Sequence, residues 1–295
     1  MSFSFNDIIF SNEQRKPDDY AAITKELKRD ILKSLALAGS GHPGGALGIA
    51  ELMAVLHFGG VMRYDATNPT WKERDRFILS PGHYVPVLYS CLAHCGYFPT
   101  SELATLRKLG TRLQGHPAGF GFTPGIETTT GSLGQGVSIA VGMAMSDKLI
   151  DKNSHKVFCL SGDGELQEGS CWEAAMSASM HHLDNLCWIV DNNDCQIDGR
   201  VKEVMSIYPL KEKFESFGFA VIELNGNDVE QVISGYEQFN ANHKNKINKP
   251  TCIIAKTIMG NEISLMHDKY QWHGNPPTIA QAEEALKELE DTNNE

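Results

Sequence analysis

The sequence predicts an α/β fold of three layers, in which a mostly parallel sheet has helices on both faces. Apolar, strand-like runs alternate with helical runs along the chain, as expected when helices join parallel strands. The 295 residues are 41% hydrophobic and 21% charged, which is ordinary for a globular protein with a sizeable core. No linker rich in proline, glycine or serine interrupts the alternation. We therefore expect residues 1–295 to form a single domain with a short N-terminal lead and a polar C-terminal tail.

The first half of the chain consists of helical runs separated by turns rich in glycine and proline. Apolar residues three and four positions apart predict the first helix, and a glycine pair ends it. Glycine and proline also fix the turns around the next helix and the first strand. The expected elements are helices over 20–38, 49–62, 103–109 and 137–149 and a strand over 76–79.

The second half alternates more regularly. Two apolar strands joined by a helix form one βαβ unit, and a second such unit follows. A long irregular segment, 256–274, precedes a charged terminal helix. The expected elements are strands over 157–160, 186–190, 219–224 and 251–255 and helices over 171–182, 229–242 and 279–290.

Charge and cysteine content narrow the class of protein. The net charge of −11 argues against nucleic acid and anionic membranes as partners. The seven cysteines are scattered and suggest reduced core residues. Cys91, His94 and Cys95 could share a helix face like metal ligands, but no second pair follows at zinc-ligand spacing. No apolar run could span a bilayer, and no signal peptide is evident, so we expect a cytoplasmic protein.

Polar motifs follow both strands of the first βαβ unit. Gly162-Asp163-Gly164 comes after one strand and Asp191-Asn192-Asn193 after the other. Because parallel strands end at the same edge, Asp163 and Asn193 are expected to converge where open α/β sheets bind ligands. Their oxygens suit Mg²⁺ bound to phosphate, and the glycines let phosphate approach the backbone. Each motif alone is also common in ordinary turns, but the two in this order favour a metal-diphosphate site.

Four histidines stand in loops bounded by glycine or proline: His42, His83, His116 and His273. Any one of them could be a capping or merely solvent-facing residue. Together, beside a diphosphate site, they indicate groups that donate to phosphate oxygens or exchange hydroxyl protons near pH 7. The pair at 181–182 is expected only to end a helix.

In order and spacing these motifs resemble those of transketolases. The resemblance runs from about residue 20 to residue 274 and covers only the diphosphate-binding half of such an enzyme. It implies the thiamine-diphosphate-binding fold. The matching segments are 40–44, 74–80 with 82–83, 115–117, 129–136, 162–169 and 197–199.

The resemblance implies thiamine diphosphate as cofactor, with Mg²⁺ (or Ca²⁺ or Mn²⁺) bound to its diphosphate. The implied metal ligands are Asp163, Asn193 and the carbonyl of Cys195. The implied cofactor contacts are His83, Gly131, Leu133, Gly162, Asp163, Gly164, Glu165, Asn193, Ile197 and His273. Three histidines that face the ketose hydroxyls and two carboxylates at the subunit boundary are implied as catalytic residues: His42, His116, His273, Glu168 and Glu173.

The implied activity is the transfer of a two-carbon ketol unit from a ketose phosphate to an aldose phosphate. Full-length transketolases continue into a pyrimidine-binding domain, which supplies a glutamate to the cofactor and basic residues to the sugar phosphate. This sequence lacks that domain. We therefore expect a separate C-terminal subunit, an α2β2 heterotetramer, and no activity of the isolated chain.

Other functions stay open at this point. The chain could be half of a different thiamine enzyme, such as 1-deoxyxylulose-5-phosphate synthase or a 2-oxo acid dehydrogenase α subunit, or a non-catalytic cofactor-binding subunit. The run 166–169 and the histidine set favour transketolase, and a metal hydrolase would need an HExxH-like pair that is missing. Departures from the family pattern at Pro81, Ser132, Glu165 and 266–272 leave the sugar undefined.

Overall fold

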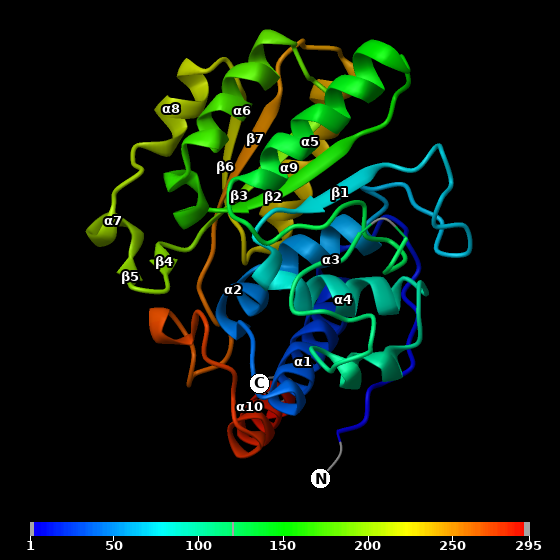
Figure 1. Cartoon of the computed structure of the whole chain (residues 1–295), viewed down its shortest axis with the longest axis vertical. Coiled ribbons are helices and arrows are strands. Elements are labelled where there is room, and N and C mark those ends of the chain that lie inside the picture. Colours follow the sequence, from blue (N-terminus) through cyan, green and yellow to red (C-terminus); the bar gives the residue numbers. More distant parts are fainter. Residues whose placement is uncertain (1–2, 120, 292–295) are drawn as a thin grey trace.

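A parallel sheet of five strands forms the centre of the molecule (Figure 1). The computed structural model describes residues 3–119 and 121–291. From one edge to the other the strands are β1 (Arg76–Leu79), β2 (Val157–Gly162), β3 (Leu186–Asn192), β7 (Thr251–Lys256) and β6 (Ala220–Asn225). All neighbouring pairs are parallel, which confirms the predicted fold class. In the register of β2 and β3, Gly162 lies opposite Asp191, so both polar motifs leave the sheet at the same edge.

Helices cover both faces of the sheet because its strands are apolar on both sides. Val157 and Cys159 belong to one core cluster, whereas Phe158 and Leu160 point into the other. The first face is covered by α5 (Gln135–Met145), α6 (Gly169–Met180) and α8 (Leu210–Ser216). On the second face, α9 (Val229–Lys244) packs on β6 and β7 and contacts α3 (Ala50–Phe58). Helices α1 (Tyr20–Ala38), α2 (Pro43–Gly48), α4 (Val85–His94) and α10 (Ile279–Asp291) complete the core on that side, and α10 packs on α1.

Several predicted boundaries were wrong for identifiable reasons. The predicted helix 49–62 corresponds to α3, which ends earlier, at Phe58, before Gly60 with φ +71°. Helix α2 was not predicted, because it begins in the glycine- and proline-rich turn before that helix; Pro43 marks turns but also fits the first position of a helix, where a missing N–H costs nothing. The predicted helix 103–109 is a 3-10 helix, Thr100–Thr105, followed by Arg107 in a left-handed conformation. Helix α4 was not predicted as an element, because its second residue, Pro86, also marks turns.

Smaller elements line the carboxyl edge of the sheet. A hairpin of β4 (Cys195–Gln196) and β5 (Gly199–Arg200) leads into the short helix α7 (Val201–Val204). Short 3-10 turns follow β1, at Gly82–Tyr84, and β2, at Gly164–Gln167. Two others lie nearer the ends of the chain, at Pro17–Asp19 and Tyr270–Trp272, and a π turn, Ser146–Ile150, follows α5. All seven cysteines are buried and free. Among the described residues, no helix combines the length and apolarity needed to cross a membrane.

Candidate active site

The turns after β2 and β3 are joined by side-chain hydrogen bonds. Asp163 is buried, and its carboxylate accepts from the backbone N–H of Gly164 at 2.7 Å and from that of Asp194 at 2.6 Å. The Asn193 side-chain oxygen accepts from the backbone N–H of Cys195 at 2.8 Å. The two polar motifs therefore converge in space, and their oxygens face a common edge of the sheet.

Tyr84 and Asp191 hold the Asn193 side chain in place by hydrogen bonds. The Asn193 amide donates to the Asp191 carboxylate at 2.6 Å and to the Tyr84 hydroxyl at 3.3 Å. Asp191 also accepts from the hydroxyl of Thr257, at the end of the neighbouring strand. Because the nitrogen of the Asn193 amide makes the contacts with Asp191 and Tyr84, they fix which amide atom is the oxygen. Of the three residues that are hydrogen-bonded around the Asn193 amide, Asp191 belongs to a motif predicted from the sequence, whereas Tyr84 and Thr257 do not.

The electrostatics of this edge suit a divalent cation. Burial, and then the neighbouring Asp191 carboxylate, raise the pKa of Asp163 well above its usual value. Burial raises the pKa of Asp191 to about 6. Within residues 3–119 and 121–291, no ion pair joins either carboxylate to a cationic side chain. A bound Mg²⁺ would stabilise the ionised form of Asp163, so the donor set of carboxylate, amide and backbone oxygens fits the implied metal.

A cavity of about 170 Å³ lies beside these turns. At Gly162, a Cβ atom would approach only the Tyr84 hydroxyl, at 4.0 Å, so the backbone there is open to a ligand. Two apolar side chains at the cavity are left exposed, Leu133 by 37% and Ile197 by 63%. This combination of open backbone and bare apolar groups suits a ligand with an anionic end and an apolar ring. The predicted residues that line the cavity are His83, Leu133, Gly162, Asp163, Gly164, Glu165, Glu168, Cys195, Ile197 and His273.

Three imidazole rings gather at one side of the cavity. The centroid of the His83 ring lies 4.8 Å from that of His42 and 5.0 Å from that of His273. Each ring has a buried nitrogen without a hydrogen-bond partner in the described structure: Nδ1 of His42, Nε2 of His83 and Nδ1 of His273. Unpartnered buried nitrogens are costly, and a diphosphate or sugar hydroxyl would satisfy them. This grouping is independent support for a polar ligand at this edge.

Burial favours the neutral form of all four histidines. Burial, followed by the neighbouring His273, lowers the pKa of His42 to about 4. Burial also lowers the pKa of His83 and of His273. For His116, burial and then the Arg107 guanidinium lower the pKa. Neutral imidazoles can accept a proton from a hydroxyl group, as general bases do.

Two more predicted residues, His116 and Gly131, pack against each other, and the two predicted carboxylates, Glu168 and Glu173, are exposed. His116 packs on the glycine-rich loop, where a Cβ at Gly131 would lie 2.8 Å from its ring. Gly131 has φ +139°, so only glycine fits this approach. Glu168 is exposed at the cavity rim. Glu173, on the solvent side of α6, does not line the cavity.

The buried side chain of Glu165 accepts hydrogen bonds from residues of three loops. Its carboxylate accepts from the Ser80 hydroxyl, from the backbone N–H of Gly134 at 2.8 Å and from that of Gly162 at 3.2 Å. Its predicted contact with the cofactor stays a prediction, because both of its oxygens are taken by protein donors. The Ser80 contact had no sequence signal, since 85 positions separate the two residues.

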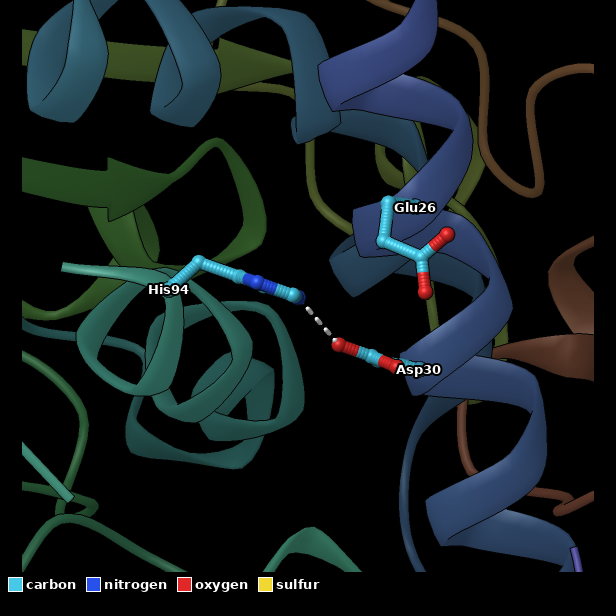
Figure 2. Close-up of side chains that lie close together, drawn as sticks. All are labelled: Glu26, Asp30 and His94. Atoms are coloured by element: carbon cyan, nitrogen blue, oxygen red, sulfur yellow. Dashed lines mark hydrogen bonds and ion pairs between the residues drawn. The ribbon is translucent and has the colours of Figure 1, made fainter. Parts of the chain in front are cut away.

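A second cluster of titratable side chains lies elsewhere, between α1 and α4 (Figure 2). The His94 ring contacts the Asp30 carboxylate through Nε2 at 2.9 Å and the carbonyl of Ile8 through Nδ1 at 2.6 Å, and Glu26 lies nearby. Both partners are acceptors, so both ring nitrogens must carry protons. Burial alone would lower the pKa of His94, but the hydrogen bond to Asp30 raises it. An imidazolium has no lone pair for a metal, so this cluster is an ion pair that anchors the N-terminal segment.

Comparisons with known proteins identify the family of this site. Residues 21–290 match the family described as transketolase, thiamine diphosphate binding domain. The chain is 41% identical over 280 residues to a transketolase of Homo sapiens, covering 94% of this chain and 43% of that protein. The chain thus spans less than half the length of that relative.

Shorter relatives match along most of their length. The 6-deoxy-6-sulfo-D-fructose transketolase subunit SqwG of Clostridium sp. (strain MSTE9) is 40% identical over 264 residues, which cover 90% of this chain and 94% of that protein. An apulose-4-phosphate transketolase subunit from Phocaeicola vulgatus is 38% identical, covering 89% of this chain and 90% of that protein. Among solved structures, a transketolase from Leishmania mexicana superposes with a TM-score of 0.83 at 33% identity, covering 95% of this chain and 41% of that chain.

Proposed function

The chain belongs to the transketolase family through its thiamine diphosphate-binding domain, and from this premise we propose that it is one subunit of a two-subunit transketolase. The observation that carries the proposal is that the Asp163 and Asn193 turns meet at one sheet edge beside three imidazoles, each with one buried nitrogen that has no partner among the described residues. The size of the shorter relatives supports a subunit rather than a whole enzyme, since the chain covers 94% of SqwG.

The residues at the carboxyl edge would hold the diphosphate end of the cofactor. Asp163, Asn193 and the Cys195 carbonyl would bind Mg²⁺, and His83, His273 and the two glycines that line the cavity, Gly162 and Gly164, would contact the diphosphate. Gly131 and the exposed Leu133 and Ile197 would contact the aromatic rings. When bound, thiamine diphosphate supplies an electron sink for cleaving and forming a carbon–carbon bond next to a carbonyl.

The protein's own contribution to the chemistry would be proton transfer and orientation. His42 and His273 are neutral and half-buried, so either can take the proton of the donor hydroxyl during cleavage. His116, on the glycine-rich loop, would orient the retained sugar fragment. Glu168 and Glu173 are exposed, which leaves them available to a partner chain.

The partner in this proposal is a second polypeptide with the pyrimidine-binding domain, assembled as α2β2. The substrates would be a ketose donor and an aldose acceptor that carry phosphate. The two shorter relatives are named for different sugars, 6-deoxy-6-sulfo-D-fructose and apulose 4-phosphate. Neither name therefore identifies the substrate of this chain. All the reported relatives are transketolases, which favours ketol transfer over the synthase and dehydrogenase alternatives. The cytoplasmic location stays a prediction that the buried free cysteines support.

The test is to produce this chain together with the product of its neighbouring gene and to purify the complex. Transfer of a two-carbon unit between sugar phosphates should require both chains, thiamine diphosphate and Mg²⁺, and each chain alone should be inactive. A complex that binds the cofactor but transfers no such unit from any ketose phosphate would contradict the proposal. That result would instead support a non-catalytic binding subunit.

A further inference from the structure

We propose that Lys28 is a positioning residue for the site, because it clamps the segment that leads to His273 onto helices α1 and α3. The inference rests on the proposed function, which gives His42 and His273 their roles. Lys28 lies on α1, outside the cavity, and belongs to none of the motifs recognised in the sequence.

Lys28 stands at the centre of a buried ionic cluster. Its side chain has no exposed area, and Nζ lies 2.6 Å from Oε1 of Glu51 on α3 and 2.8 Å from Oε2 of Glu262. Glu51 is also buried, whereas the Glu262 side chain is 51% exposed. Glu262 therefore approaches from the surface segment and Glu51 from the core. The ammonium group joins the two.

The same cluster holds the start of the segment that follows β7. The Asn227 amide donates to Glu51 at 2.9 Å and to the carbonyl of Gly48 at 2.8 Å. Its oxygen accepts from the backbone N–H of Ile258 at 2.8 Å. The segment is thus attached to α3 at Ile258 through Asn227 and at Glu262 through Lys28.

From there the segment packs directly on the turn that carries His42. The backbone N–H of Gly260 donates to the carbonyl of Gly44 at 2.8 Å. A Cβ atom at Gly44 would lie 2.6 Å from a carbon of Met259 and 2.9 Å from the carbonyl of Trp272. Trp272 immediately precedes His273, and His42 immediately precedes α2. A shift of the clamped segment would therefore move His273 relative to His42.

Because its charges are buried, this cluster is better suited to positioning the segment before His273 than to stabilising the folded protein. Removing an ammonium and a carboxylate from water costs free energy that their attraction offsets only in part. A packed apolar side chain would stabilise α1 at least as well. What the ionic cluster adds is a directional contact between three elements, and this contact defines where the segment lies.

The test uses Glu262→Gln, because the variant leaves the buried pair of Lys28 and Glu51 intact. Glu223→Gln is the matched control, since Glu223 is also a half-exposed acid in an ion pair, with Lys211 at 3.0 Å. Both variants should change the melting temperature by less than about 3 °C. In the complex with the partner subunit, Glu262→Gln should weaken binding of thiamine diphosphate with Mg²⁺ about fivefold to tenfold, whereas the control should not.

A second readout uses the isolated chain and does not depend on the proposed function. Burial lowers the pKa of His273, so a loosened segment should raise that pKa toward its ordinary value, as measured by NMR titration. Loss of a negative charge alone would lower it, so a rise reports movement. Unchanged affinity together with an unchanged His273 pKa would overturn the inference. If the wild-type complex binds no cofactor, the proposed function fails, and the titration alone decides the role of Lys28.

Discussion

The Glu165 carboxylate accepts a hydrogen bond from the backbone N–H of Gly134 at 2.8 Å and so joins the turn after β2 to the glycine-rich loop before α5. The same oxygen accepts from the Ser80 hydroxyl at the end of β1, and the other accepts from Gly162. One buried side chain thus determines how three loops lie around the cavity. This arrangement requires a carboxylate, because both of its oxygens face donors.

Replacing Glu165 by Gln should therefore weaken the contacts between the three loops without leaving a cavity, because the two side chains have nearly the same size. The amide nitrogen of Gln would face a donor, so one of the three hydrogen bonds is lost. We expect the complex to bind thiamine diphosphate about tenfold more weakly, measured by isothermal titration calorimetry. The exposed acid Glu215 provides the control variant, Glu215→Gln. Unaltered affinity of Glu165→Gln would mean that the loops are held by other contacts.

The histidine cluster should contribute to turnover more than to cofactor retention. His42→Ala removes an imidazole whose ring lies beside those of His83 and His273. The expected result is a fall in kcat/KM for the sugar donor of about 10²–10⁴-fold, with cofactor affinity nearly unchanged. His181→Ala, at the end of α6, is the control and should behave like the wild type. An equal loss in both variants would argue against a specific role for His42.

The ion pair of His94 and Asp30 should make stability depend on pH. The pKa of His94 is raised in the folded state, so its contribution is complete below the unfolded pKa of about 6.5 and is lost as the pH rises through the folded value. The groups that face the ring are Asp30, the Ile8 carbonyl and Glu26, and Asp30 also accepts from the Ser90 hydroxyl at 2.7 Å.

Urea unfolding of the wild type and of His94→Gln measures this contribution. We expect the variant to lose about 1–3 kcal/mol of unfolding free energy at pH 5.5 and clearly less at pH 9. A difference that stays the same at both pH values, or grows with pH, would contradict a protonated His94.

The sheet and most of its helices could be predicted because their signals are local. Strand β2 alternates between two apolar cores, and α1 repeats its apolar residues at helical spacing, so its bounds, Tyr20–Ala38, were predicted correctly. Predictions failed where proline begins a helix, as at Pro43 and Pro86, because the same residue also marks turns. Tertiary burial decides between these meanings, and a local pattern does not contain it.

Some features of the site could likewise be predicted from the sequence, and others could not. The meeting of Asp163 and Asn193 followed from two strand ends in one parallel sheet, which sequence order alone predicts. The contacts of Lys28 with Glu262 could not be predicted, since 234 positions separate them and neither stands in a motif. The contact of Ser80 with Glu165 could not be predicted although both residues stand in matching segments, since 85 positions separate them. Positioning contacts of this kind are properties of the fold and not of a segment.

The most direct measurement for the account is the binding of thiamine diphosphate to the complex of this chain with its partner, with and without Mg²⁺, in the wild type and in Asp163→Ala. The wild type should bind the cofactor only with Mg²⁺. The variant should bind none, because it lacks the charged metal ligand, and Asp151→Ala, at an exposed acid, should bind normally. Circular dichroism must show that Asp163→Ala is folded. A folded variant that retains the cofactor as the wild type does would contradict the assignment of this edge as the metal-diphosphate site.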